Sequence, residues 1–176
     1  MSLFSIIIPV QNSERFIEEC LLSVLDQNFY NYEILIIDDC SKDLSLQICI
    51  KYKNKFPSIK IINLNRNKGV SYCRNLGMKS SVGEYIIFLD SDDCLEKFSL
   101  YKLAKYIKNN QHADMIIASH KNNLKYRHAS SSNLFYRKNF QNLRGNNNIK
   151  IKFINQIPYF IGYCWNFIIK RKFLEK

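Results

Sequence analysis

The chain has 176 residues, 47% of them hydrophobic and 14% aromatic. That composition supports one globular domain and excludes a disordered, collagen-like or coiled-coil chain as an overall description. The formal net charge of +11 is unevenly distributed. Residues 1–94 carry 10 basic and 12 acidic side chains, whereas residues 95–176 carry 16 basic and 3 acidic ones. The carboxylates are therefore concentrated in the first half and the cations in the second.

The basic second half favours an anionic partner or a solvated lysine-rich surface. Of the 26 basic residues only 7 are Arg, the residue that phosphate and base recognition prefers, so we expect no nucleic-acid partner. Peripheral contact with an anionic membrane is the other interpretation. The six cysteines form no C-x-x-C pair and the sequence begins without an apolar signal segment. We therefore expect a cytoplasmic protein, peripheral on the inner face of the membrane if that contact is made.

Apolar runs and amphipathic stretches alternate along the first two thirds of the chain. Short runs rich in β-branched residues predict strands at residues 3–9, 33–37, 59–64, 84–89 and 114–118. Apolar residues at helical spacing predict helices at residues 14–27 (with Ser13 as N-cap), 43–52, 69–79 and 97–109. This alternation predicts an α/β fold, with a mostly parallel twisted sheet and helices on both faces.

The regular pattern ends near residue 118, so residues 1–118 are the expected α/β core. We expect residues 119–176 to form a basic, partly irregular C-terminal extension of the same domain, with residues 134–136 as a candidate edge strand. Residues 157–169 are strongly apolar but fall short of the roughly 20 residues that span a bilayer. A buried strand or helix is favoured for them over an aromatic patch lying on a membrane.

Acidic residues follow two of the predicted strands. Asp38 and Asp39 come after the second strand, and Asp90, Asp92 and Asp93 come after the fourth. In a parallel sheet, ligands bind outside the carboxyl ends of the strands, and this topology brings both acidic groups to one edge. We therefore expect them to share a cleft.

Asp90 and Asp92 form a D-x-D motif that predicts a site for Mn²⁺ or Mg²⁺, because hard divalent cations prefer carboxylate oxygens and relieve the repulsion between them. The alternative is that these residues, with Asp93, cap the next turn and helix. Arg74 lies in a helix that begins near the same edge, where its guanidinium can pair with a carboxylate or a diphosphate. Its alternative is an ordinary surface charge.

Four segments, in this order, resemble the successive blocks of family-2 glycosyltransferases with the GT-A fold, a Rossmann-like nucleotide-sugar-binding domain. They are residues 4–12 (FSIIIPVQN), 33–43 (EILIIDDCSKD), 67–77 (NKGVSYCRNLG) and 83–93 (GEYIIFLDSDD). Residues 165–174 (WNFIIKRKFL) resemble, more weakly, a later block of bacterial members. The resemblance implies metal-dependent transfer of a sugar from a nucleotide diphosphate sugar, usually a UDP-sugar, to a glycan or lipid-linked acceptor with inversion.

The resemblance also implies roles for individual residues. Asp39 would bond the uracil ring, and Pro9 with Gln11 would line the base pocket. Arg74 would lie beside the diphosphate. Asp90 would contact the ribose or the metal, and the principal metal ligand would be Asp92.

The sequence departs from the family pattern in two ways. Position 11 is usually aromatic, and here it is Gln11. The acidic pair that usually supplies the general base is not found, since the late acids are Glu96, Asp114 and Glu175, so the catalytic base is unknown. Our hypothesis is that the chain is the nucleotide-sugar-binding part of a longer transferase, or a naturally shortened transferase with an incomplete acceptor region. The alternatives are a non-catalytic nucleotide-sugar-binding protein and, less favoured, a sugar nucleotidyltransferase.

Overall fold

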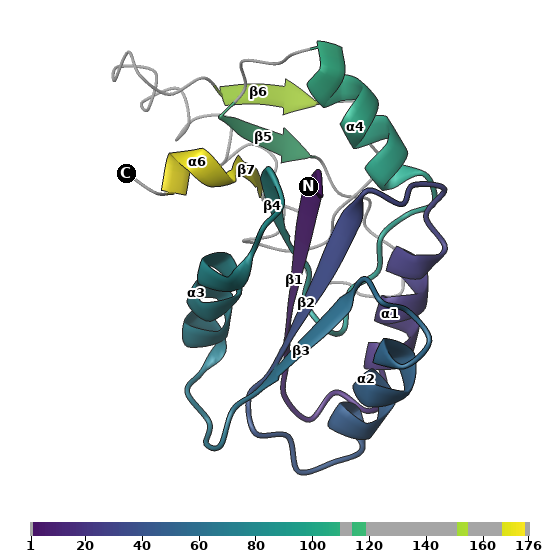
Figure 1. Cartoon of the computed structure of the whole chain (residues 1–176), viewed down its shortest axis with the longest axis vertical. Coiled ribbons are helices and arrows are strands. Elements are labelled where there is room, and N and C mark those ends of the chain that lie inside the picture. The colour runs from purple at the N-terminus through teal and green to yellow at the C-terminus, as the bar shows by residue number, and fades with distance from the viewer. Residues whose placement is uncertain (1, 110–113, 119–150, 155–166, 175–176) are drawn as a thin grey trace, which may run out of the picture.

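A mixed sheet forms the centre of the molecule (Figure 1). The computed structural model describes residues 2–109, 114–118, 151–154 and 167–174. Its strands are β1 (Phe4–Val10), β2 (Tyr32–Asp38), β3 (Ile59–Asn63), β4 (Tyr85–Phe88), β5 (Met115–Ala118), β6 (Ile151–Ile154) and β7 (Phe167–Lys170). Its helices are α1 (Ile17–Leu25), α2 (Ser45–Lys53), α3 (Val70–Ser80), α4 (Ser99–Asn109) and α6 (Arg171–Leu174). Within the described residues, the strand order is β3-β2-β1-β4-β7-β5-β6.

The first four strands form the parallel half of the sheet. β1 pairs in parallel with both β2 and β4, and β3 extends the sheet beyond β2. Every residue of β1 and β2 is buried, as expected for central strands with helices on both faces. The predicted α/β architecture is confirmed.

The two faces of β1 pack against different helices. Ile6 and Ile8 belong to the larger buried cluster, which includes residues of α1, α2 and α4, whereas Ile7 packs with Cys73 of α3. Figure 1 shows α3 on the side of the sheet opposite α1 and α2. A Cβ added to Gly77 would collide with the Ile7 side chain, so α3 approaches β1 closely at this glycine.

β7 is the antiparallel member of the sheet. It lies between β4 and β5, and its Ile168 pairs with Ile87 on one side and Ile116 on the other. The strand predicted at residues 114–118 therefore pairs with β7 and β6 instead of joining β4 directly. Residues 167–169, the end of the apolar run, belong to this strand. The rest of that run and the candidate edge strand at residues 134–136 lie outside the described residues.

At the amino end of the sheet, the buried carboxylate of Glu33 joins neighbouring segments through hydrogen bonds. Glu33 of β2 is 4% exposed and accepts hydrogen bonds from Ser5 Oγ (2.6 Å), the Val82 N–H (2.7 Å) and Lys60 Nζ (2.9 Å). The Gly83 N–H donates in turn to Ser5 Oγ (2.8 Å). Burial raises the pKa of Glu33, but these hydrogen bonds and the Lys60 charge outweigh it and leave the pKa below its usual value. The connection from α3 to β4 is thus bonded to both β1 and β2.

Candidate functional site

The predicted site residues lie along the carboxyl ends of neighbouring strands, which we call the rim. Pro9 is near the end of β1 and Gln11 follows it; Asp39 follows β2, and Asp90 lies just beyond β4. These strands are adjacent and parallel, in the order β2-β1-β4. The fold therefore brings all four residues to one edge, as the sequence predicted.

Asp39 is held inside the rim by the start of α3. The residue is 3% exposed, and its carboxylate accepts hydrogen bonds from the backbone N–H groups of Lys68 (2.7 Å) and Gly69 (2.8 Å). Gly69 has a φ of 85°, a conformation that suits glycine. Asp39 thus fixes the loop between β3 and α3 against the end of β2. A bond from Asp39 to a uracil ring stays a prediction, and it would use lone pairs that the two backbone bonds leave free.

Arg74 connects the same helix to the second acidic segment. Its Nη2 lies 2.9 Å from Asp90 Oδ1, and the two side chains are 14% and 24% exposed. Arg74 is five residues beyond Gly69, the N-cap of α3, which corresponds to about 7.5 Å of helix axis. Both acidic segments therefore contact the first turns of one helix, and the surface-charge interpretation of Arg74 is wrong.

The acidic loop after β4 carries charge that its surroundings only partly neutralise. Burial raises the pKa of Asp90, the Arg74 pair opposes that rise, and Asp92 adds to it. Burial, with the charges of Asp92 and Asp90, raises the pKa of Asp93 to about 7. Asp92 is exposed. A bound cation would relieve the repulsion among these carboxylates.

The donor atoms on the rim suit a hard divalent cation. Asp90 and Asp92 offer carboxylate oxygens, which Mg²⁺ and Mn²⁺ prefer. Among the residues that the structure describes, no group of three or more His, Cys, Asp or Glu side chains could hold a metal ion by itself. Mg²⁺ commonly takes one or two protein carboxylates and completes its shell with phosphate oxygens and water. The residues therefore fit a cation that arrives with a diphosphate.

Pro9 and Gln11 have different environments on the rim. Pro9 is buried in β1 opposite Ile37 of β2. It lies beyond the stretch of β1 that pairs with β4, so its missing N–H removes no bond from that ladder. Gln11 is exposed beyond the strand, where a ligand can reach its side chain.

Hydrogen bonds join the loops of the rim. The hydroxyls of Ser13 and Ser91 lie 2.7 Å apart and link the β1–α1 loop to the acidic loop. The Ser13 N–H donates to Ser45 Oγ (2.7 Å), and the Lys42 N–H donates to Asn12 Oδ1 (2.8 Å). The β1–α1 loop is thus bonded to the loops on both sides, which restricts the movement of the acidic loop.

Ser13 is not the helix N-cap that the sequence predicts, because α1 begins at Ile17 and has no side-chain cap. The Ser13 carbonyl accepts the N–H groups of Phe16 and Ile17, while its hydroxyl is engaged with Ser91. The partner is 78 residues away in the sequence, so no local pattern could have revealed this contact. The residue type of Asn12 is a weak sequence signal for a tight turn, since Asn tolerates the left-handed region. The structure has a φ of 49° there.

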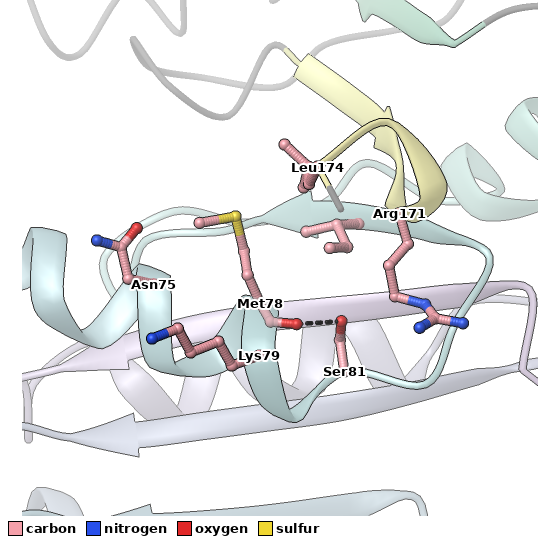
Figure 2. A pocket seen from close by; sticks show the side chains of 7 residues that line it. Asn75, Met78, Lys79, Ser81, Arg171 and Leu174 are labelled. Atoms are coloured by element: carbon pink, nitrogen blue, oxygen red, sulfur yellow. Dashed lines mark hydrogen bonds between the residues drawn. The ribbon is translucent and has the colours of Figure 1, made fainter. Parts of the chain in front are cut away.

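A separate hollow of about 410 Å³ lies away from the rim, between α3, β4 and α6 (Figure 2). Its lining includes Met78 and Lys79 of α3 and Arg171 and Leu174 of α6. The Arg171 Nε–H donates to the Gly83 carbonyl (2.9 Å), so this guanidinium helps to attach α6 to the connection between α3 and β4. None of the predicted site residues lines this hollow.

No helix in the described part of the chain combines the length and the apolarity needed to cross a bilayer.

Known sequences resemble this chain over much of its length. Residues 5–176 match the family described as Glycosyl transferase family 2. The chain is 39% identical over 120 residues to poly(ribitol-phosphate) beta-N-acetylglucosaminyltransferase TarS of Staphylococcus aureus, covering 66% of this chain and 21% of that protein. It is 42% identical over 110 residues to a poly(ribitol-phosphate) beta-glucosyltransferase of Bacillus spizizenii, covering 61% and 17%. The chain thus spans about a fifth of the length of these relatives.

Solved structures resemble the fold described above. The crystal structure of S. aureus TarS 1-349 matches with a TM-score of 0.68 and 37% identity, over 75% of this chain and 39% of that one. The same protein in complex with UDP-GlcNAc matches with a TM-score of 0.67 and 36% identity, over 74% and 38%. The GT-A fold that the sequence predicted is confirmed.

Proposed function

Since the chain belongs to glycosyl transferase family 2, we propose that it binds a nucleotide diphosphate sugar at the rim and transfers the sugar to a glycan or lipid-linked acceptor. A UDP-sugar is the favoured donor, because a similar structure is that of TarS in complex with UDP-GlcNAc. Relatives named for poly(ribitol-phosphate) favour a phosphate-bearing glycan as the acceptor. The main support is that Asp39 and Asp90, which follow β2 and β4, both bond to the start of α3, at the Gly69 N–H and the Arg74 guanidinium.

In this proposal, different rim residues bind different parts of the donor. Pro9 and Gln11 line the pocket for the base, and Asp39 bonds the base while it holds the β3–α3 loop. Arg74, half-buried and already paired with Asp90, directs its guanidinium toward the diphosphate. The buried bond between Ser13 and Ser91 keeps the acidic loop in position.

Asp90 and Asp92 would hold Mg²⁺ or Mn²⁺, which offsets the negative charge that develops on the departing diphosphate. Inversion at the anomeric carbon also needs a general base that removes the proton of the acceptor hydroxyl. We assign that role to no described residue, so the proposal rests on donor binding. The basic second half would face the anionic acceptor or the membrane that carries it.

A thermal-shift experiment tests donor binding. UDP, UDP-GlcNAc, UDP-glucose and GDP are added to the chain with and without Mn²⁺. A ligand at about 100 times its Kd stabilises the folded state by about 2.7 kcal/mol. For a chain of this size that raises Tm by roughly 5–10 °C. We expect this rise for the uridine nucleotides with Mn²⁺, and a smaller one for GDP.

Two acidic substitutions make the experiment specific. Asp92→Asn should abolish the additional stabilisation by Mn²⁺, because it removes the proposed principal ligand. Asp26→Asn changes the charge by the same amount at a side chain that is 71% exposed and paired with Lys97, and it should behave like the unmodified protein. The proposal is wrong if no nucleotide shifts Tm, or if Asp92→Asn keeps the full Mn²⁺ response.

A further inference from the structure

The exposed face of α4 is cationic, with aromatic side chains at its start. Leu100, Leu103 and Ile107 are buried on its inner side. The exposed side carries what we call the α4 stripe: Phe98, Tyr101, Lys102, Lys105 and Lys108. At about 100° per residue the four helical members, Tyr101, Lys102, Lys105 and Lys108, fall within an arc of about 120°, and Phe98 directly precedes the helix. The helix is therefore strictly amphipathic, with a continuous outward face.

The charge on this stripe is not balanced locally. The helix contains no acidic residue. Within the described residues, Lys102, Lys105 and Lys108 form no salt bridge. The neighbouring acid Asp26 pairs with Lys97, outside the stripe, at 3.5 Å. Among the described residues, the three lysines of the α4 stripe thus have no acidic partner, and their charge suits an anionic surface.

The aromatic part of the stripe has an unusual backbone. Phe98 has a φ of 65°, the left-handed region that a bulky residue rarely adopts, and its side chain is 46% exposed. Tyr101, one turn further, is 53% exposed. The fold therefore accepts a strained residue that leaves an aromatic ring in water. Aromatic rings beside lysines on one helix face are typical of segments that lie in a membrane interface.

We propose that the α4 stripe docks this chain on an anionic membrane surface. The three lysines contact lipid headgroups, and Phe98 and Tyr101 enter the interface beside them. Figure 1 shows α4 at the opposite end of the molecule from the β3–α3 loop, so docking through α4 leaves that side of the rim open. This proposal does not depend on sugar transfer, because it uses none of the rim residues.

Vesicle flotation of the whole chain tests the proposal. The vesicles are phosphatidylcholine alone or with about 30% phosphatidylglycerol, in about 0.05 M and about 0.5 M salt. We expect binding to the anionic vesicles at low salt, and little binding at high salt or to neutral vesicles. The triple variant K102Q/K105Q/K108Q should lose up to about 100-fold in partition coefficient. Phe98→Ser should also weaken binding.

The control variant K53Q/K55Q/K79Q removes three exposed lysines elsewhere, so its net charge equals that of the test variant. It should bind vesicles like the unmodified chain. Circular dichroism and the UDP thermal shift confirm that both variants fold and that the rim is unchanged. The proposal is overturned if the unmodified chain does not float with anionic vesicles, or if the two triple variants lose binding equally. It is also overturned if soluble polyphosphate binds the stripe and the vesicles do not.

Discussion

Arg74 is the side chain on which the rim depends most, because it contacts Asp90 from the helix that Asp39 anchors. We expect Arg74→Ala to weaken UDP binding by at least tenfold, since a hydrogen bond to a charged group contributes about 1.5–3 kcal/mol. Isothermal titration calorimetry measures this change. Lys79→Ala, at an exposed position near the end of the same helix, should leave the affinity within twofold. Equal losses in the two variants would contradict a specific role for Arg74.

Glu33 lies at the amino end of the sheet, and its titration should make the free energy of unfolding depend on pH. Its pKa is lowered on folding, so its contribution is present above the unfolded pKa and is lost as pH falls through the folded pKa. Glu33→Gln should therefore cost about 2 kcal/mol at pH 7 and progressively less below about pH 4. Urea unfolding across this pH range measures the difference. Glu84→Gln, at a carboxylate that is 49% exposed, should cost little at any pH.

At the scale of the elements, the contact between α3 and β1 determines whether Arg74 reaches the rim. Gly77→Ala places a methyl group against Ile7, which should cost about 1–3 kcal/mol through overpacking. Because Gly77 lies one turn after Arg74, the displaced helix should also weaken UDP binding. Urea unfolding and calorimetry measure the two effects. The matched change Asn75→Ala, at an exposed position of the same helix, should affect stability by less than about 0.5 kcal/mol.

The sequence predicted the first nine elements because each one has a local signal. The buried runs of β1 and β2 and the spacing of Ile17, Leu21 and Val24 in α1 are legible without tertiary information. The position of Asp39 and Asp90 on one rim followed from parallel topology alone. The partners of these carboxylates did not, since the Lys68 and Gly69 N–H groups become available only once the β3–α3 loop is folded.

For the whole molecule, β7 decides whether the sheet is continuous. Ile168 is completely buried and pairs with both β4 and β5. Ile168→Asn should lower the free energy of unfolding by about 3 kcal/mol or more, because it removes apolar contacts and buries an amide without a prepared partner. Denaturant unfolding measures this loss. Lys172→Asn, at an exposed position in α6, should be nearly neutral, and a similarly small effect at Ile168 would contradict the sheet order.

The antiparallel position of β7 could not be predicted from the alternation of strands and helices. The apolar run at residues 157–169 predicts a buried segment, but it does not predict the strands with which that segment pairs. Its register is set by contacts across more than 80 residues, such as Ile87 with Ile168. Local periodicity contains no information about a pairing over that distance.

This pairing has a consequence for the order of events during protein synthesis. β4 and β5 leave the ribosome well before residues 167–170, so each exposes an unsatisfied strand edge while translation continues. Co-translational folding can complete the parallel half of the sheet, but the other half can form only after β7 has been synthesised. The nascent chain at that stage is a natural client for chaperones that bind extended apolar segments.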